Sequence, residues 1–202
     1  NYTYGTNGLK VDIPRIVNYI DKEIMKGDIA EAKLFNPDFI IANMHWGLEY
    51  ERIPSREQRE LADWLMRQGV DLVIGSHPHV VQPMELRRGK EGVTDRLVVY
   101  SLGNFISNMS REHTDGGVMV KVVLGRKGLR RYIVSAQYSL IYSSRYKNEQ
   151  GKEDIRVVPA ASWSGKNQNS SFSVDSALIK YVNNTRLFLK GNNKEVEEYI
   201  FE

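Results

Sequence analysis

Three of the four histidines of this 202-residue chain occur in two short stretches, one of which also contains an acidic residue. His45 and Glu49 belong to "MHWGLEY", and His77 and His79 belong to "GSHPH". Imidazole nitrogen is a common ligand for Zn, Mn and Fe, and a nearby carboxylate can add an oxygen donor. The chain has no cysteine, which excludes disulfides and thiolate metal sites. These residue types predict a site for a divalent metal ion.

Each of these side chains also has a plainer reading. A lone histidine at the end of a strand is usually a loop residue bonded to backbone, although three that converge favour a ligand cluster. The proline of "HPH" biases His77 toward an extended backbone, so His77 and His79 are expected to project to the same side. Glu49 can be a metal ligand, a carboxylate that orients a histidine, or an ordinary surface acid, and we expect it to orient a ligand or contact substrate. His113 has no partner in the pattern and is expected to be a loop residue.

Two apolar runs with a helical segment between them must position these residues. Residues 38–44 and 71–75 are predicted to be buried strands, because both are apolar and bounded by turn or charged residues. The segment between them contains a capping box, formed by Ser55 and Gln58, and it predicts a helix over 56–68. A strand, a helix and a strand in so short a segment form a βαβ unit with parallel strands and a right-handed crossover.

Parallel strands end at the same edge of a sheet, and ligands of open α/β sheets bind outside that edge. His45 follows the first predicted strand, and His77 and His79 follow the second. We therefore expect the three imidazoles within roughly 10 Å of one another, as ligands of one or two metal ions must be. Trp46 and Tyr50 are expected to be packing residues.

Helical spacing predicts an amphipathic helix over 14–26, with Gly27 as its stop. Further along the chain, strand-like segments are separated by turns without a helical pattern, which favours antiparallel strands. These segments cover residues 96–105, 117–125 and 129–142.

The last part of the chain is polar and rich in turn residues. Residues 142–173 are predicted to be a long surface excursion, disordered in part, and residues 174–187 and 193–201 to be short closing helices. The expected division is into a domain over 1–141 and a C-terminal extension over 142–202.

The net charge of +3 arises from 28 basic and 25 acidic residues that are mixed along the chain. This mixture is typical of a solvated surface and argues against a nucleic-acid partner. No window approaches the ~18 apolar residues of a membrane span, and no signal segment is visible at the N-terminus. Because the first residue is Asn1 and not methionine, we expect a processed or truncated product whose membrane attachment, if any, lies upstream.

Four blocks occur in order over about residues 1–125. They are "HWGLEY", the pattern P-x-x-x-Q-x-x-L-A-x-x-L, "GVDLVIGSHPHVVQ" and "YSLGNF". In these blocks the chain resembles the bacterial capsule synthesis protein family called CapA, which is tied to poly-γ-glutamate synthesis and is similar to calcineurin-like metallophosphoesterases. The resemblance implies an α/β fold of the metallophosphoesterase-like layered type (α/β/β/α). This chain would be its incomplete C-terminal part, with a parallel βαβ unit followed by antiparallel strands.

The resemblance also implies roles for single residues. His45 matches the isolated histidine ligand of that family, and His77 and His79 match its Gly-His-x-His block, so the implied cofactor is Mn, Zn or Fe, with two ions in a longer parent chain. Asn104 of "YSLGN" would lie near the site, and with Glu49 it is a candidate catalytic residue.

The family site also needs an Asp/His block, a bridging aspartate and an Asn-His block, all upstream, and "NYTYGTNGL" looks like the tail of the last of these. We therefore expect this chain to hold at most one weakly bound metal and to be almost inactive as a phosphoesterase. The implied function is capsule or polymer synthesis in the extracytoplasmic cell envelope, acting on an anionic polymer or a phosphorylated substrate together with other capsule-synthesis proteins. The alternative is an assembly or polymer-binding factor that keeps the fold without turnover.

Overall fold

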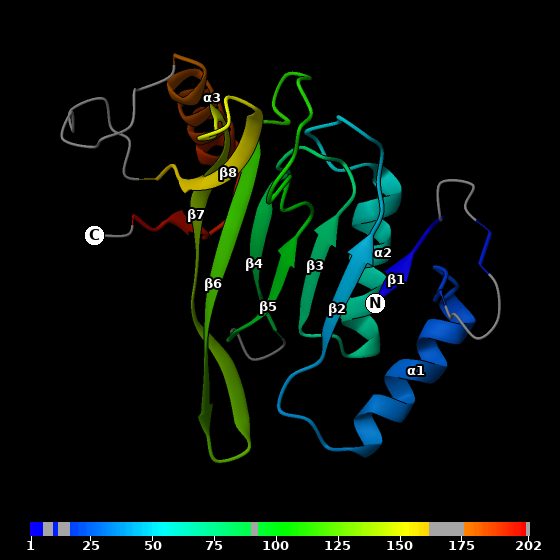
Figure 1. Ribbon diagram of the computed structural model, residues 1–202. Helices are drawn as coiled ribbons and strands as arrows, with labels where there is room; N and C mark the ends of the chain where they lie inside the picture. Colours follow the sequence, from blue (N-terminus) through cyan, green and yellow to red (C-terminus); the bar gives the residue numbers. More distant parts are fainter. Residues whose placement is uncertain (6–9, 12–16, 90–92, 162–175, 201–202) are drawn as a thin grey trace.

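The computed structural model of the chain contains two β-sheets that face each other, with helices outside them (Figure 1). It describes residues 1–5, 10–11, 17–89, 93–161 and 176–200. The first sheet has the strand order β1-β2-β3-β5-β4. Its strands are β1 (Tyr2–Thr3), β2 (Ile41–His45), β3 (Leu72–Ser76), β4 (Met84–Arg88) and β5 (Thr94–Val99).

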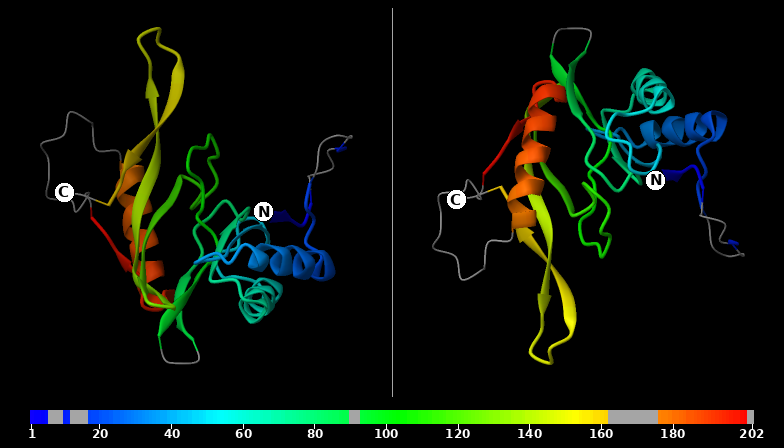
Figure 2. Two further views of the ribbon diagram at one scale, coloured as in Figure 1. Left: turned by 90° about the horizontal axis from the view of Figure 1, so that it is seen from below. Right: turned by 90° about the horizontal axis from the view of Figure 1, so that it is seen from above.

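The second sheet has the order β6-β7-β8, and β9 pairs with β7. Helices α1 and α2 lie on the side of the first sheet that faces away from the second sheet, and α3 lies on the opposite side of the molecule (Figures 1 and 2). The elements are β6 (Gly116–Lys127), β7 (Arg130–Lys147), β8 (Glu153–Pro159), β9 (Glu197–Glu198), α1 (Lys22–Leu34), α2 (Arg56–Gln68) and α3 (Ser176–Asn192). The fold is α/β with mixed parallel and antiparallel pairing, consistent with part of a metallophosphoesterase-like sandwich.

Apolar side chains fill the space on both faces of the first sheet. One cluster packs α1 and α2 against β2 and β3, and it includes Met25, Met44 and Leu65, each at most 1% exposed. A second cluster lies between the two sheets and continues onto α3, and it includes Leu97 and Leu140. Burial of this area is the main favourable free energy of folding, and it fixes the first sheet from both sides.

The predicted βαβ unit is confirmed. Strands β2 and β3 are parallel, in register from Ile41 opposite Leu72 to His45 opposite Ser76. Helix α2 has the predicted bounds, and both hydrogen bonds of the capping box are present: the Gln58 backbone N–H donates to Ser55 Oγ, and the Ser55 N–H donates to Gln58 Oε1. The edge at which β2 and β3 end is therefore positioned by local signals in the sequence.

Loss of the capping hydroxyl should be measurable. In a Ser55→Ala variant we expect the free energy of unfolding to fall by about 1 kcal/mol, because the Gln58 N–H loses its acceptor at the first turn of α2. Urea unfolding followed by circular dichroism measures this difference. The matched control is Ser110→Ala at an exposed loop position, which should leave the midpoint unchanged. Equal midpoints for the two variants would contradict the capping role.

The predicted helix over 14–26 is wrong in its bounds. Residues 12–16 lie outside the described part of the chain, and α1 begins at Lys22 and continues through Gly27 to Leu34. Its start is set by Asp21, whose side chain accepts hydrogen bonds from the N–H groups of Glu23 and Ile24. A good N-cap outweighs apolar spacing, and a single glycine does not end a helix that is packed on one face.

The expectation of antiparallel strands after the βαβ unit is correct for β6, β7 and β8 and wrong in part for β5. Strand β5 pairs in parallel with β3 and antiparallel with β4, a strand that the sequence reading did not include. The position of β5 inside the first sheet agrees with its buried apolar run Leu97–Val99, since strands covered on both faces are continuously apolar.

The C-terminal part also differs from its prediction. Strand β7 continues to Lys147 and β8 pairs with it, so residues 142–159 are largely a regular antiparallel ribbon where an irregular, partly disordered surface excursion was predicted. Residues 162–173 lie outside the described part. One helix, α3, is present where the first closing helix was predicted, but the second is replaced by β9. The boundary at residue 141 falls inside β7, and a division there stays a prediction.

The position of β9 depends on contacts far apart in the sequence. The Arg186 guanidinium on α3 donates to both carboxylate oxygens of Glu198 on β9, at 2.8 to 3.0 Å. Such a paired contact has no signal in the local pattern of residues.

None of the described helices is long and apolar enough to cross a membrane.

Candidate metal centre

Strands β2 and β3 end at the upper edge of the first sheet in Figure 1, and the three histidines belong to these strand ends and the segment that follows β3. His45 is the last residue of β2, and His77 directly follows β3. The ring centroids of His45 and His77 are 4.5 Å apart, and those of His77 and His79 are 6.0 Å apart. The predicted convergence is confirmed for both pairs.

Glu49 lies in the same cluster. One ligand atom each of Glu49, His77 and His79 can be chosen so that all three lie within 4.8 Å of one another. Ligand atoms around one tetrahedral ion are about 3.4 Å apart when each metal–nitrogen bond is about 2.1 Å long. Separations of up to 4.8 Å would have to close by about 1.4 Å to bring all three donors onto one ion, which is within the range of side-chain rotation. The residues fit a divalent metal.

The backbone at the histidine pair is not the predicted one. His77 has φ +102° and His79 has φ +62°, so the expected extended backbone at His77 is wrong. Positive φ is uncommon for residues with a Cβ and persists only where surrounding contacts hold it. One such contact is the hydrogen bond from the Tyr50 N–H to the Pro78 carbonyl, 2.8 Å long. Unfavourable backbone of this kind concentrates at functional sites.

Asn104 fixes the orientation of His79. Its amide nitrogen donates to the Thr114 carbonyl at 2.9 Å, and its Oδ1 lies 3.0 Å from His79 Nδ1. Because this oxygen can only accept, Nδ1 carries the proton and Nε2 keeps its lone pair. A ligand histidine is commonly held in this way, by an oxygen bonded to its other ring nitrogen. Asn104, predicted near the site, therefore lies against a predicted ligand.

Removing this contact should weaken metal binding. In an Asn104→Ala variant we expect Zn²⁺ or Mn²⁺ affinity to fall about tenfold, since both the tautomer and the ring position of His79 become free to vary. Isothermal titration calorimetry measures the affinity. Asn108→Ala, at an exposed position of the same loop, is the control and should bind as the unmodified chain does. An undiminished affinity in Asn104→Ala would show that the contact is incidental.

Burial favours the neutral form of His45 and of His77. It lowers the pKa of His45, and nearby His79 lowers it further. Burial also lowers the pKa of His77, to which His45 adds, while Glu49 opposes the shift. Metal ligation needs the unprotonated nitrogen, so the lowered pKa values of His45 and His77 favour the form that binds an ion.

The loop that carries Glu49 is tied down by a buried chain of amides. Gln58 Nε2 on α2 donates to Gln82 Oε1, and Gln82 Nε2 donates to the Glu51 carbonyl, each at 2.8 Å. Gln58 and Gln82 are at most 2% exposed. Buried polar groups are costly without partners, so this chain holds the loop close to the segment that follows β3.

The expected packing role is confirmed for Trp46 and stays a prediction for Tyr50, which is half-buried beside the cluster. Trp46 is buried, and its Nε1 donates to the Tyr100 carbonyl at 2.9 Å. Tyr50 stacks on His79 with ring centroids 6.0 Å apart, and the Arg111 guanidinium lies 3.9 Å from the centre of the Tyr50 ring. His113 lies in a turn, as predicted.

Tyr4 is a member of the site that the sequence reading missed. It follows β1, and its hydroxyl oxygen lies 2.8 Å from His77 Nε2. Its ring meets that of His77 edge-on at 4.9 Å and lies 6.4 Å from that of His45. A strand as short as β1 has too few residues to show an alternation. The visible signal was an aromatic pair before a glycine, "YTYG".

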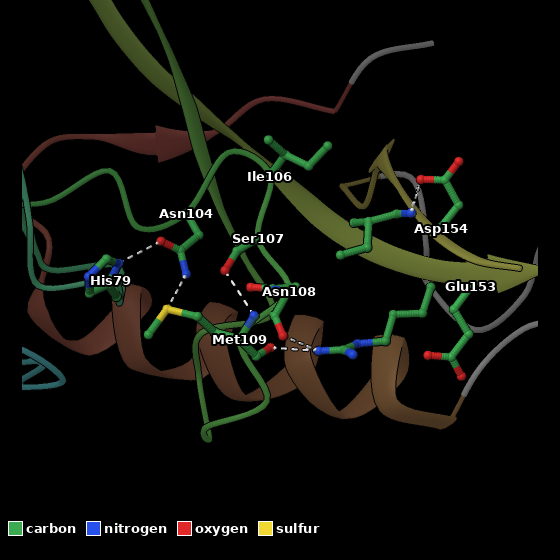
Figure 3. Close-up of a pocket in the computed structure, with 10 residues that line it drawn as sticks. His79, Asn104, Ile106, Ser107, Asn108, Met109, Glu153 and Asp154 are labelled. Atoms are coloured by element: carbon green, nitrogen blue, oxygen red, sulfur yellow. Dashed lines mark hydrogen bonds between the residues drawn. The ribbon is translucent and has the colours of Figure 1, made fainter.

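A groove with a volume of about 780 Å³ begins at His79 and Asn104 (Figure 3). It runs past the loop over 106–109 to β8, where Glu153 lies at its other end. Arg145 on β7 holds the loop by donating to the carbonyls at 108 and 109. The groove is large enough for a ligand that extends away from the candidate metal centre.

The two facing sheets form an α/β fold that is consistent with part of a metallophosphoesterase-like sandwich, and a histidine and glutamate cluster lies at the carboxyl ends of its parallel strands. Residues 2–109 match the bacterial capsule synthesis protein family, PGA_cap. The match covers more than half of the chain and includes every predicted site residue, and the chain belongs to this family. The resemblance seen in the sequence blocks is thereby confirmed.

Two capsule biosynthesis proteins are similar in sequence to this chain. The PGA biosynthesis protein CapA of Bacillus subtilis (strain 168) is 35% identical over 115 residues, which is 57% of this chain and 28% of that protein. The capsule biosynthesis protein CapA of Bacillus anthracis is 35% identical over 107 residues, which is 53% of this chain and 24% of that protein. The chain thus spans about a quarter of the length of these relatives.

Proposed function

We propose that this protein takes part in the synthesis of a capsule or poly-γ-glutamate type polymer at the bacterial cell envelope, outside the cytoplasm. We further propose that Glu49, His77 and His79 hold a divalent ion, Mn, Zn or Fe, with His45 beside them. The observation that carries this proposal is the convergence of three donor atoms within 4.8 Å at the edge of a parallel sheet. Membership of the capsule synthesis family and the similarity to the two CapA proteins support a role in polymer synthesis.

An ion at this position supplies Lewis acidity toward a phosphoryl or carbonyl oxygen. The groove beside His79 would receive the adjoining part of an anionic polymer or a phosphorylated substrate. Asn104 keeps His79 in place, and the amide chain from Gln58 to Gln82 holds the loop of Glu49. In this reading these residues bind and orient, and the reaction class is metal-assisted hydrolysis.

The proposed occupancy is one ion. Among the described residues of the cluster Glu49 is the single carboxylate. Two divalent ions a few ångströms apart repel each other strongly unless carboxylates bridge and neutralise them. This favours slow turnover at most by the chain alone. Occupancy by one ion is also compatible with a second function. In that function the protein is a polymer-binding or assembly factor that works with other capsule-synthesis proteins and retains the fold without catalysis.

Metal content and hydrolysis, measured on the same preparation, separate these functions. Purified protein is dialysed against Mn²⁺ or Zn²⁺, its metal content is measured by elemental analysis against that of the dialysis buffer, and its hydrolysis of bis(p-nitrophenyl) phosphate is then assayed. We expect about one ion per chain, lost in a His77→Ala/His79→Ala variant, and almost no turnover. Turnover that disappears in the double variant would establish the hydrolase. Metal bound equally by both proteins would contradict the proposed centre, and fractionation of the parent protein into the cytoplasm would contradict the location.

A further inference from the structure

The contact between Tyr4 and His77 leaves one ring nitrogen of His77 engaged and the other open. We propose that Tyr4 is a positioning residue of the metal centre: its hydroxyl oxygen accepts a hydrogen bond from Nε2–H of His77 and so leaves Nδ1 as the metal ligand. This inference rests on the metal centre proposed above. It concerns which atom of His77 binds the ion and what holds that atom in place.

Tyr4 is held beside the cluster by its backbone. Strand β1 pairs in parallel with β2, with Thr3 opposite His45, and the Tyr4 N–H donates to the His45 carbonyl at 3.2 Å. On its other side β1 is joined to the segment before α1, since the Ile20 N–H donates to the Thr3 carbonyl at 2.8 Å. The hydroxyl of Tyr4 therefore reaches His77 from a fixed strand end and not from a free terminus.

The chemistry of imidazole gives the direction of the hydrogen bond. A neutral ring has one N–H donor and one lone pair, and a bound metal takes the lone pair. If the metal took Nε2, the 2.8 Å contact with Tyr4 would have to break, whereas binding through Nδ1 preserves it. Tyr4 is 54% exposed, so its own hydroxyl proton can turn toward water while its oxygen accepts.

The same arrangement occurs at the neighbouring ligand with the nitrogens exchanged. His79 gives Nδ1–H to the oxygen of Asn104 and keeps Nε2 open. His77 would give Nε2–H to the oxygen of Tyr4 and keep Nδ1 open. Ligand histidines commonly donate their other ring N–H to an oxygen, and loss of such a partner typically costs 10- to 100-fold in metal affinity.

The test compares Tyr4→Phe with Tyr2→Phe. Tyr2 lies on the same strand but donates its hydroxyl to Asp28 at 2.7 Å, so Tyr2→Phe removes the same group without touching His77. Affinity for Mn²⁺ or Zn²⁺ is measured by calorimetry at neutral pH. We expect about tenfold weaker binding in Tyr4→Phe and unchanged binding in Tyr2→Phe. NMR spectroscopy of protein labelled with ¹⁵N-histidine should show His77 protonated at Nε2 before metal is added. The chemical shift of its Nδ1 should change when the metal binds.

The outcomes separate this inference from the proposed centre. Unchanged binding in Tyr4→Phe, or a ¹⁵N shift of Nε2 on metal addition, would overturn the role of Tyr4 while leaving the centre in place. Tighter binding in Tyr4→Phe would also overturn it, because the hydroxyl would then compete with the ion for Nε2. No metal binding by the unmodified chain or by either variant would overturn the centre and the inference together.

Discussion

Metal affinity is expected to fall by about 100-fold or more in a His77→Ala variant. His77 is the central member of the cluster: it is 6% exposed, within ring contact of both other histidines, and grouped with Glu49 as a potential donor. Its removal leaves Glu49 and His79 as the remaining donors of that group, and two donors hold an ion far more weakly than three. Calorimetric titration with Zn²⁺ or Mn²⁺ measures the loss.

His113→Ala is the matched control for this variant. His113 is the fourth histidine, it lies in a turn, and it does not belong to the donor cluster. Circular dichroism should show the same secondary structure for both variants, because His77 lies outside the strands and its ring contributes little to the apolar clusters. A comparable loss of affinity in His113→Ala, or full affinity in His77→Ala, would contradict the assignment of the ligands.

The largest expected effect on stability is that of Gly75→Ala. Gly75 lies within β3, and an added Cβ would lie 2.0 Å from the Tyr100 carbonyl oxygen and 2.5 Å from Trp46 Nε1. Both groups are buried and bonded to each other, so neither can move without loss. We expect the free energy of unfolding to fall by about 3 kcal/mol, as for overpacked cores. His77 follows two residues later, so metal affinity should fall as well.

Gly27→Ala serves as the control, because we expect it to raise the free energy of unfolding where Gly75→Ala lowers it. Gly27 lies within α1, and nothing lies within 4 Å of an added Cβ. Alanine costs less backbone entropy than glycine in a helix, so we expect stabilisation by about 0.5 to 1 kcal/mol. Guanidinium unfolding of both variants against the unmodified chain gives the two differences. A Gly75→Ala midpoint equal to that of the unmodified chain would show that β3 can shift without cost.

The segment from β2 to the histidine pair is predictable because its signals are local. The Ser55 and Gln58 capping box sets the start of α2, and the continuous apolar runs set the two strands. Once those elements are known, the handedness and parallel pairing of a βαβ unit place His45 and His77 at one edge. The order of the motifs also led to the correct family.

Other features depend on contacts between residues that are distant in the chain. The place of β5 beside β3, the strand pairing of β9 through Glu198 and Arg186, and the approach of Tyr4 to His77 all follow from packing or hydrogen bonds across more than ten residues. Local propensity is weak compared with such contacts. The positive φ at His77 has the same origin: the sequence favours an extended backbone before a proline, and the surrounding hydrogen bonds and sheet edge impose another conformation.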